Sequence, residues 1–102
     1  MENVKALFVV VNCGFAEEII NLARSCGARG ATILHARGVG LNVKEIMGIT
    51  VDSEREIILS LVDDETASKI MAAVKEKSGI SSLAHGVCFT LPVDNMTKMN
   101  LS

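Results

Sequence analysis

Apolar residues fall in short segments along the chain, and their spacing predicts strands and helices in turn. Residues 4–11 form a nearly continuous valine-rich run, which favours a strand covered on both faces. Residues 15–26 carry apolar residues at helical spacing, and Gly27 supplies a stop. Residues 31–39 predict a second strand, and residues 56–62 predict a third strand that is apolar on both sides.

The second half of the chain predicts one more helix and one more strand. Asp63 or Asp64 is suited to cap a helix whose apolar residues recur from Ala67 to Val74 and which closes at Gly79. Residues 87–91 predict a fourth strand, ended by Pro92. The resulting order, β-α-β-β-α-β, predicts an α+β, ferredoxin-like split βαβ fold with an antiparallel sheet and two helices on one face.

Two helices cover only one face of such a sheet. The first and third strands are nevertheless apolar on both faces, and an exposed apolar sheet face is unfavourable in a monomer. We therefore expect a closed oligomer whose sheets pack together.

Composition narrows the class of protein. The 102 residues carry a net charge of −2, three aromatic residues and one proline, which suit one folded domain over residues 1–102 and disfavour nucleic-acid binding. The longest apolar run is too short to span a bilayer and no signal peptide precedes it, so we expect a cytoplasmic protein without membrane insertion. Cys13, Cys26 and Cys88 form no C-x-x-C pair, which favours buried free thiols.

The connection between the second and third strands, residues 41–53, is long for a hairpin and has no sustained period. Such length predicts a functional, ligand-gated mobile loop. Its apolar residues favour either a partner-docking patch or packing within the oligomer. The residues predicted to bind a partner are Val43, Ile46, Met47 and Ile49.

Two glycine-containing segments are candidates for ligand contact. The first, Gly38-Val39-Gly40, precedes the long connection, and its glycines allow close backbone approach to a ligand. The second, residues 78–86, joins the second helix to the fourth strand and carries three serines and His85. We expect the two segments to meet across a subunit boundary in a cleft.

These segments resemble the nitrogen-regulatory P-II family of signal-transduction proteins. The resemblance covers nearly the whole chain: GATILHARGVG at residues 30–40, the long connection, VDD at 62–64, SG at 78–79 and GVCFTLPV at 86–93. It implies a homotrimer with ATP or ADP in clefts between subunits, and a T-loop, here residues 41–53, that contacts a partner protein such as a membrane transporter. It also assigns residues 93–102 to a C-terminal tail.

Carried over by position, the resemblance predicts a set of ligand-binding residues. They are Thr32, Gly38, Val39, Gly40, Asn42, Ser78, Gly79, His85, Gly86, Val87 and Lys98.

The chain departs from the family where phosphate charges are bound. Leu41 and Asn42 replace a basic residue and a glutamine, Val87 replaces a lysine, and Asn100 replaces a second basic residue of the tail. Since charge-assisted hydrogen bonds contribute roughly 1.5–3 kcal/mol each, we expect the affinity for a nucleoside triphosphate to be lower than in the family. The chain contains no tyrosine, which excludes tyrosine nucleotidylation.

Two other classes of function compete with this prediction. His35, His85 and the cysteines suggest a metal- or small-molecule-binding oligomer without nucleotide, although their spacing is not that of a zinc site. An acylphosphatase-like enzyme would need a phosphate-binding loop with an arginine after the first strand, and Asn12-Cys13-Gly14 lacks one. We therefore predict a regulatory protein with no catalytic residues and no metal ligands.

Overall fold

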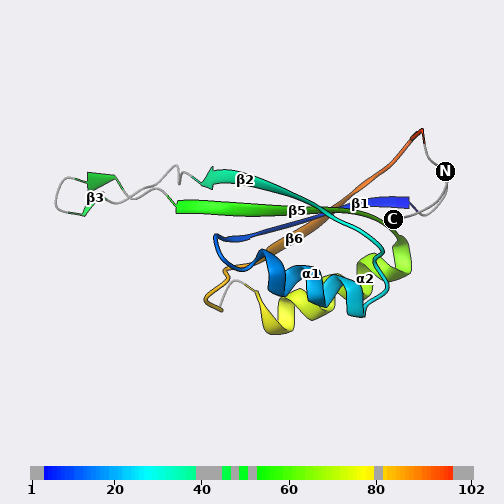
Figure 1. The fold of residues 1–102 in the computed structure, drawn as a ribbon, viewed down its shortest axis with the longest axis horizontal. Helices are drawn as coiled ribbons and strands as arrows, with labels where there is room; N and C mark the ends of the chain where they lie inside the picture. The colour runs from blue at the N-terminus through cyan, green and yellow to red at the C-terminus, as the bar shows by residue number, and fades with distance from the viewer. Residues whose placement is uncertain (1–3, 39–44, 47–48, 51–52, 80–81, 98–102) are drawn as a thin grey trace.

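The computed structural model describes residues 4–38, 45–46, 49–50, 53–79 and 82–97. Eight elements follow one another (Figure 1): β1 (Val4–Asn12), α1 (Ala16–Ser25), β2 (Thr32–Gly38), β3 (Glu45–Ile46), β4 (Ile49–Thr50), β5 (Ser53–Asp63), α2 (Asp64–Lys77) and β6 (Val87–Pro92). Apart from the short pair β3 and β4, this is the predicted β-α-β-β-α-β order, so the predicted fold class is confirmed.

The main sheet has four antiparallel strands in the order β2-β5-β1-β6. The two central strands, β1 and β5, are those that the sequence predicts to be apolar on both faces. Both helices lie on one side of the sheet (Figure 1), as the split βαβ arrangement requires.

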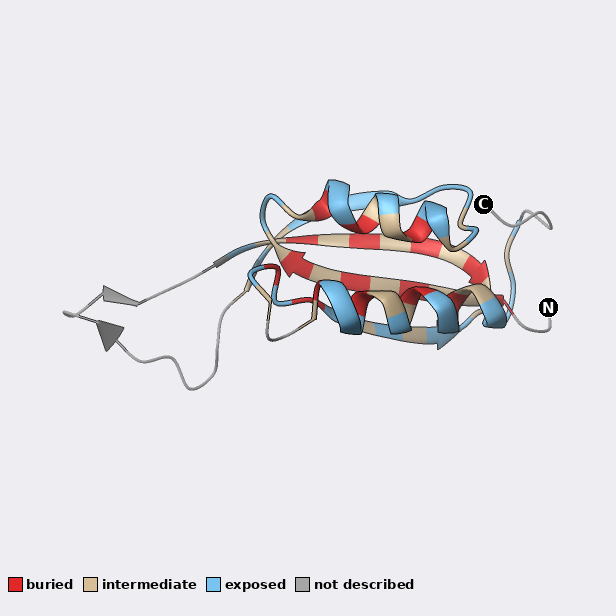
Figure 2. Cartoon of the chain, turned by 90° about the horizontal axis from the view of Figure 1, so that it is seen from below, coloured by how far each residue is buried: buried red, intermediate tan, exposed pale blue. Residues whose placement is uncertain are grey.

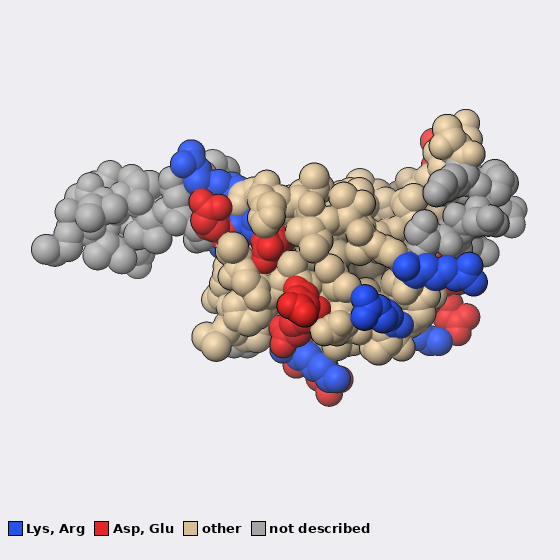
Figure 3. Space-filling model, viewed as in Figure 1, with Lys and Arg blue, Asp and Glu red and all other residues tan. Residues whose placement is uncertain are grey.

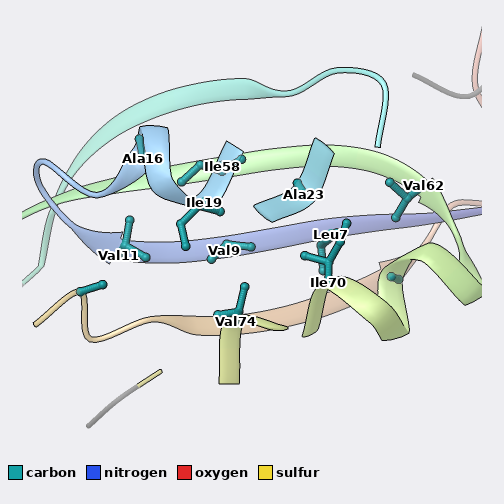
Figure 4. Close-up of a cluster of buried hydrophobic side chains, with 12 residues drawn as sticks. Leu7, Val9, Val11, Ala16, Ile19, Ala23, Ile58, Val62, Ile70 and Val74 are labelled. Atoms are coloured by element: carbon teal, nitrogen blue, oxygen red, sulfur yellow. The ribbon is translucent and has the colours of Figure 1, made fainter. Parts of the chain in front are cut away.

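The hydrophobic core fills the layer between the helices and the sheet (Figures 2 and 4). Alternate residues of the central strands point into this layer and meet one face of each helix, because side chains alternate along a strand and recur every three to four residues along a helix. The side chains exposed by no more than 4% include Leu7, Val9, Val11, Ile19, Ala23, Ile58, Val62, Ile70 and Val74. Burying one such aliphatic side chain contributes about 1.5–3 kcal/mol.

The other face of the sheet is apolar and has no helix over it. Its outer strands present Leu34, Val87, Phe89 and Leu91, each 43–50% exposed, and Phe89 stacks on Phe8 with ring centroids 5.1 Å apart. Figure 3 shows that acidic and basic side chains gather around the helices and at the two ends, leaving the region over the strands largely uncharged. This arrangement confirms that the helices cover one face only.

Two further findings differ from the sequence predictions. β5 begins at Ser53, three residues before the predicted start, because the end of β2 pairs with it as far as Gly38↔Ser53. The connection contains the short antiparallel pair of β3 and β4, with Ile46 opposite Ile49, which periodicity does not reveal.

The three cysteines differ in burial. Cys13 is exposed in the turn after β1, contrary to the expectation of buried thiols, whereas Cys26 and Cys88 are partly buried. Among the described residues, neither helix is long and apolar enough to cross a membrane.

Candidate functional site

One end of the molecule gathers most of the candidate residues. Here β1 and β2 end, β5 and β6 begin, and the segment from α2 to β6 turns back toward the sheet (Figure 1). Gly38 and the 78–86 segment therefore lie at the same end of a single chain. The sequence predicts that they meet across a subunit boundary, but they are already linked within one chain, as described below.

Residues 78 and 86 form the neck of the 78–86 segment. The Gly86 N–H donates to the Ser78 carbonyl at 2.7 Å, and the fully buried Ser78 hydroxyl donates to Glu18 Oε2 at 3.0 Å. A Cβ added at Gly86 would lie 2.2 Å from the Ser78 carbonyl oxygen, and one added at Gly79 would lie 2.7 Å from the Lys75 oxygen. Both glycines are thus required by close backbone packing, independently of any ligand.

Backbone donors in this segment are partly used by the segment itself. Ser82 donates from its N–H and its hydroxyl to the Gly79 carbonyl at 2.9 and 2.7 Å, and the His85 N–H donates to the Ser82 carbonyl at 3.2 Å. His85 is exposed and adopts φ +50°. An anion here would have to be bound by groups other than the N–H groups of Ser82, His85 and Gly86.

An open hollow of about 710 Å³ lies beside the segment, between the C-terminal half of α2 and the edge strand β6. This volume is within the usual range for small-molecule sites. Three predicted ligand residues, Gly79, Gly86 and Val87, line it, and Lys75 and Glu76 supply charges on its lining. The remaining lining residues are Met71, Ala72, Val74, Ser82 and Cys88.

Cys88 contributes an unreactive thiol to this hollow. Burial raises the pKa of the Cys88 thiol to about 11, so the group is protonated at neutral pH. A protonated thiol is a poor nucleophile and a poor metal ligand. Cys88 therefore acts as an apolar lining residue.

The base of the long connection is built from polar residues that sequence reasoning missed. Glu56, which is buried, accepts the N–H groups of Gly14 at 2.7 Å and Ala16 at 3.4 Å, and so caps α1 from a distant strand. His35 Nδ1 lies 3.8 Å from Glu56 Oε2. No local pattern signals this cap, because Glu56 is 40 or more residues from the two N–H groups that it accepts.

Asn12 and Arg55 face each other across β1 and β5 at this same end. Arg55 Nη1 donates to Asn12 Oδ1, and the Asn12 amide Nδ2 donates to the Leu83 carbonyl at 2.9 Å. The Asn12 backbone N–H also donates to the Ala84 carbonyl at 2.8 Å. These bonds join the 78–86 segment to the strands that support the long connection.

The other predicted site residues lie elsewhere. Thr32 is exposed at the opposite end of the seven-residue β2 from Gly38, and such a strand spans about 20 Å. Ile46 and Ile49 lie in β3 and β4. The remaining predicted residues, Val39, Gly40, Asn42, Val43, Met47 and Lys98, are outside the described residues.

The part of the chain that the structure describes contains no preformed site for the metal-binding alternative. No group of three or more His, Cys, Asp or Glu side chains is placed there to hold a metal ion. His35 is on β2 beside Glu56, and His85 is in the 78–86 segment.

Comparison with curated proteins yields no significant match. Solved structures share the fold at 18% identity. B. subtilis GlnK, in its ATP complex, aligns with a TM-score of 0.69 over 91% of this chain and 86% of its own. CPII of Thiomonas intermedia K12, a nitrogen regulatory PII-like protein bound to ADP, AMP and bicarbonate, aligns at 0.66 over 86% and 87%.

A third structure, Arabidopsis thaliana PII bound to citrate, aligns with a TM-score of 0.64 at 18% identity, over 89% of this chain and 78% of its own. The profile of the family described as nitrogen regulatory protein P-II matches residues 4–100, which is nearly the entire sequence. The order of elements, the glycine-containing segments and the long connection between β2 and β5 agree with that match. The chain therefore belongs to the nitrogen regulatory protein P-II family.

Proposed function

We propose that this protein is a non-catalytic regulator that binds a small ligand, with an adenine nucleotide as the leading candidate, in clefts between identical subunits. The main support is that the predicted ligand-binding residues lie at two opposite ends of the folded subunit. Gly79, Gly86 and Val87 line the hollow at one end of the molecule, Gly38 lies at the same end on β2, and Thr32 lies at the other end. One chain thus supplies two separate halves of the predicted ligand-binding site. Each half would be completed by the opposite half from a neighbouring copy of the chain.

The uncovered sheet face supports the same assembly. Its apolar side chains need a partner surface, and a second copy of the same face is the simplest one. We propose a homotrimer, the assembly that the P-II resemblance implies. Among the structural neighbours, GlnK is bound to ATP and CPII is bound to ADP and AMP, and these ligands suggest the nucleotide class for this cleft.

The output of the regulator is proposed to be a partner protein, such as a membrane transporter, contacted through residues 41–53. Val43, Ile46, Met47 and Ile49 are the proposed contact residues. This assignment rests on their apolar character and on the family resemblance. Replacing Ile46 by Asp is the direct check, since a partner contact would weaken while assembly persists.

Isothermal titration with ATP, ADP, AMP and cyclic AMP, with and without magnesium and 2-oxoglutarate, tests the ligand proposal. We expect micromolar binding of ATP or ADP near one ligand per subunit, with the triphosphate weakened by the lost basic residues. Absence of binding by all of these nucleotides would contradict the nucleotide proposal. It would also leave another small molecule as the ligand.

A filled hollow gives a sharper test of where the ligand binds. Ala72→Trp places a large ring in the hollow from an exposed position on α2 and is expected to weaken nucleotide binding by about tenfold or more. Ser68→Trp, on an exposed position one turn earlier and outside the lining, is the matched control. Equal affinity in both variants would place the ligand elsewhere.

A further inference from the structure

Asn12, the last residue of β1, ties part of the 78–86 segment to the sheet. Its backbone N–H donates to the Ala84 carbonyl at 2.8 Å, and its side-chain amide donates to the Leu83 carbonyl at 2.9 Å. Leu83 itself is 84% exposed, so its side chain contributes little to holding this turn. Asn12 therefore supplies two of the bonds that position the turn.

Arg55 extends the link to the end of β2. It pairs with Asn12 on one side and with Ala36 on the other, and its guanidinium donates to Asn12 Oδ1. Its side chain lies directly over Gly38, because a Cβ added there would be 2.8 Å from Arg55 Nε and 3.2 Å from Cγ. Only one orientation of the Asn12 amide, with oxygen toward Arg55 and nitrogen toward Leu83, satisfies both partners.

We infer that Asn12 and Arg55 are positioning residues that couple the turn at residues 82–84 to Gly38, where the connection of residues 39–52 begins. The inference rests on the proposed function in one respect, since it takes the ligand to bind beside the 78–86 segment. A ligand that favours one position of that turn then biases Arg55 and the end of β2 through a continuous chain of contacts. Ligand binding beside the 78–86 segment and the position of the end of β2 are thereby coupled within each subunit.

Amide hydrogen exchange of the protein without ligand tests the link itself. Arg55→Ala is expected to raise exchange at His85 and Gly86 by about fivefold or more, because Asn12 Oδ1 loses the donor that holds the Asn12 amide in place. Core amides such as Val9 and Ile58 report any global loss of stability and should change less. Unchanged exchange at His85 and Gly86 would overturn the inference.

Gly38→Ala completes a double-mutant cycle. Its methyl group would displace the Arg55 side chain, so it is expected to raise exchange at His85 and Gly86 in the wild-type background. In the Arg55→Ala background the clash is removed, and the same change is expected to have no further effect. Additive effects of the two substitutions would show that Gly38 and the turn are not coupled through Arg55.

Asn12→Asp removes the hydrogen bond from Asn12 to the Leu83 carbonyl and leaves the contact with Arg55 in place. The carboxylate still accepts from Arg55 but no longer donates to Leu83, so exchange should rise at His85 and Gly86 and stay unchanged at Gly38 and Ser53. Arg24→Ala, which removes an exposed arginine in the last turn of α1, is the control for the positive charge that is lost in Arg55→Ala. A rise at both ends in Asn12→Asp would contradict the proposed order of contacts.

Repeating the measurement with ATP and with ADP separates this inference from the proposed function. If nucleotide protects Gly38 and Ser53 in the wild type, Arg55→Ala should abolish that protection while protection at Gly86 persists. Persistence at all three amides would overturn the coupling. If neither nucleotide binds, the proposed ligand is wrong, and the measurements without ligand still decide whether the link exists.

Discussion

At the scale of single residues, two kinds of glycine must be distinguished in this chain. Gly14 has φ +100° and no atom within 4 Å of an added Cβ, so its constraint is conformational. Gly86 carries no such φ, but the Ser78 carbonyl oxygen occupies the space that a side chain would need. The sequence shows glycine at both positions, and only the structure separates the two reasons.

Gly86→Ala is therefore expected to destabilise the fold by about 1–3 kcal/mol, because the methyl group must displace backbone atoms and lengthen the Gly86–Ser78 hydrogen bond. Gly14→Ala is the comparison, with a cost of about 1–2 kcal/mol from the left-handed conformation alone. Urea unfolding gives both values. If Gly86→Ala also raises exchange near Glu18, whose carboxylate accepts from Ser78, the damage lies at the neck as expected. A neutral Gly86→Ala would contradict the close packing described above.

At the scale of elements, the two helices are capped in different ways. α2 has a local cap, since Asp63 Oδ1 accepts the Thr66 N–H at 2.7 Å, and this was one of the two aspartates that the sequence predicts. α1 has no side-chain cap from Phe15 and depends on Glu56, which is 42 residues from Gly14 in the sequence. A sequence pattern detects the first kind of cap because its partners are three residues apart.

The cap on α2 predicts a pH dependence of stability. Hydrogen bonds from the backbone N–H of Thr66, and next from its hydroxyl, lower the pKa of Asp63 below its ordinary value of 3.8. Since the folded pKa is below the unfolded pKa, the stabilising effect is present above about pH 4 and is lost as the pH falls through the folded pKa.

Asp63→Asn should remove this dependence. The difference in free energy of unfolding between wild type and variant is expected to shrink as the pH is lowered from about 5 to about 3. Asp64→Asn is the control, because its side chain is in the first turn and is not the cap. A difference that stays constant over this range would contradict a charged cap at Asp63.

At the scale of the whole molecule, the uncovered sheet face is the feature from which we predict an oligomer in solution. Leu34, Val87, Phe89 and Leu91 remain 43–50% exposed in a single chain, and this apolar surface is the basis of the proposed oligomer. Its strands also carry both ends of the predicted site, Gly38 at one end of β2 and Thr32 at the other. Assembly and ligand binding are therefore expected to depend on each other.

Phe89→Asp introduces a charge on the uncovered face, in the edge strand β6 opposite Phe8, and is expected to convert the proposed trimer to monomers and to abolish nucleotide binding. Size-exclusion chromatography with light scattering measures the mass, and titration measures the binding. Ser68→Asp on the exposed side of α2 is the control. A monomeric wild type, or a variant that stays trimeric, would contradict assembly through the sheet face.

The sequence by itself determined the elements and the faces of this protein. Strands repeat every two residues and helices every 3.6, so local patterns are enough to predict β1, α1, β5 and α2, the uncovered apolar face and the cap at Asp63. The P-II resemblance rests on the same local segments. Element limits moved by a few residues, as with β5, because strand pairing with Gly38 extends it.

The tertiary structure alone decided the contacts that join distant parts of the chain. The backbone packing at Gly86, the Glu56 cap on α1 and the Asn12–Arg55 link all follow from how the strands pair and where the segments meet. None has a local signal, because the partners are brought together by the fold and not by their spacing in the sequence.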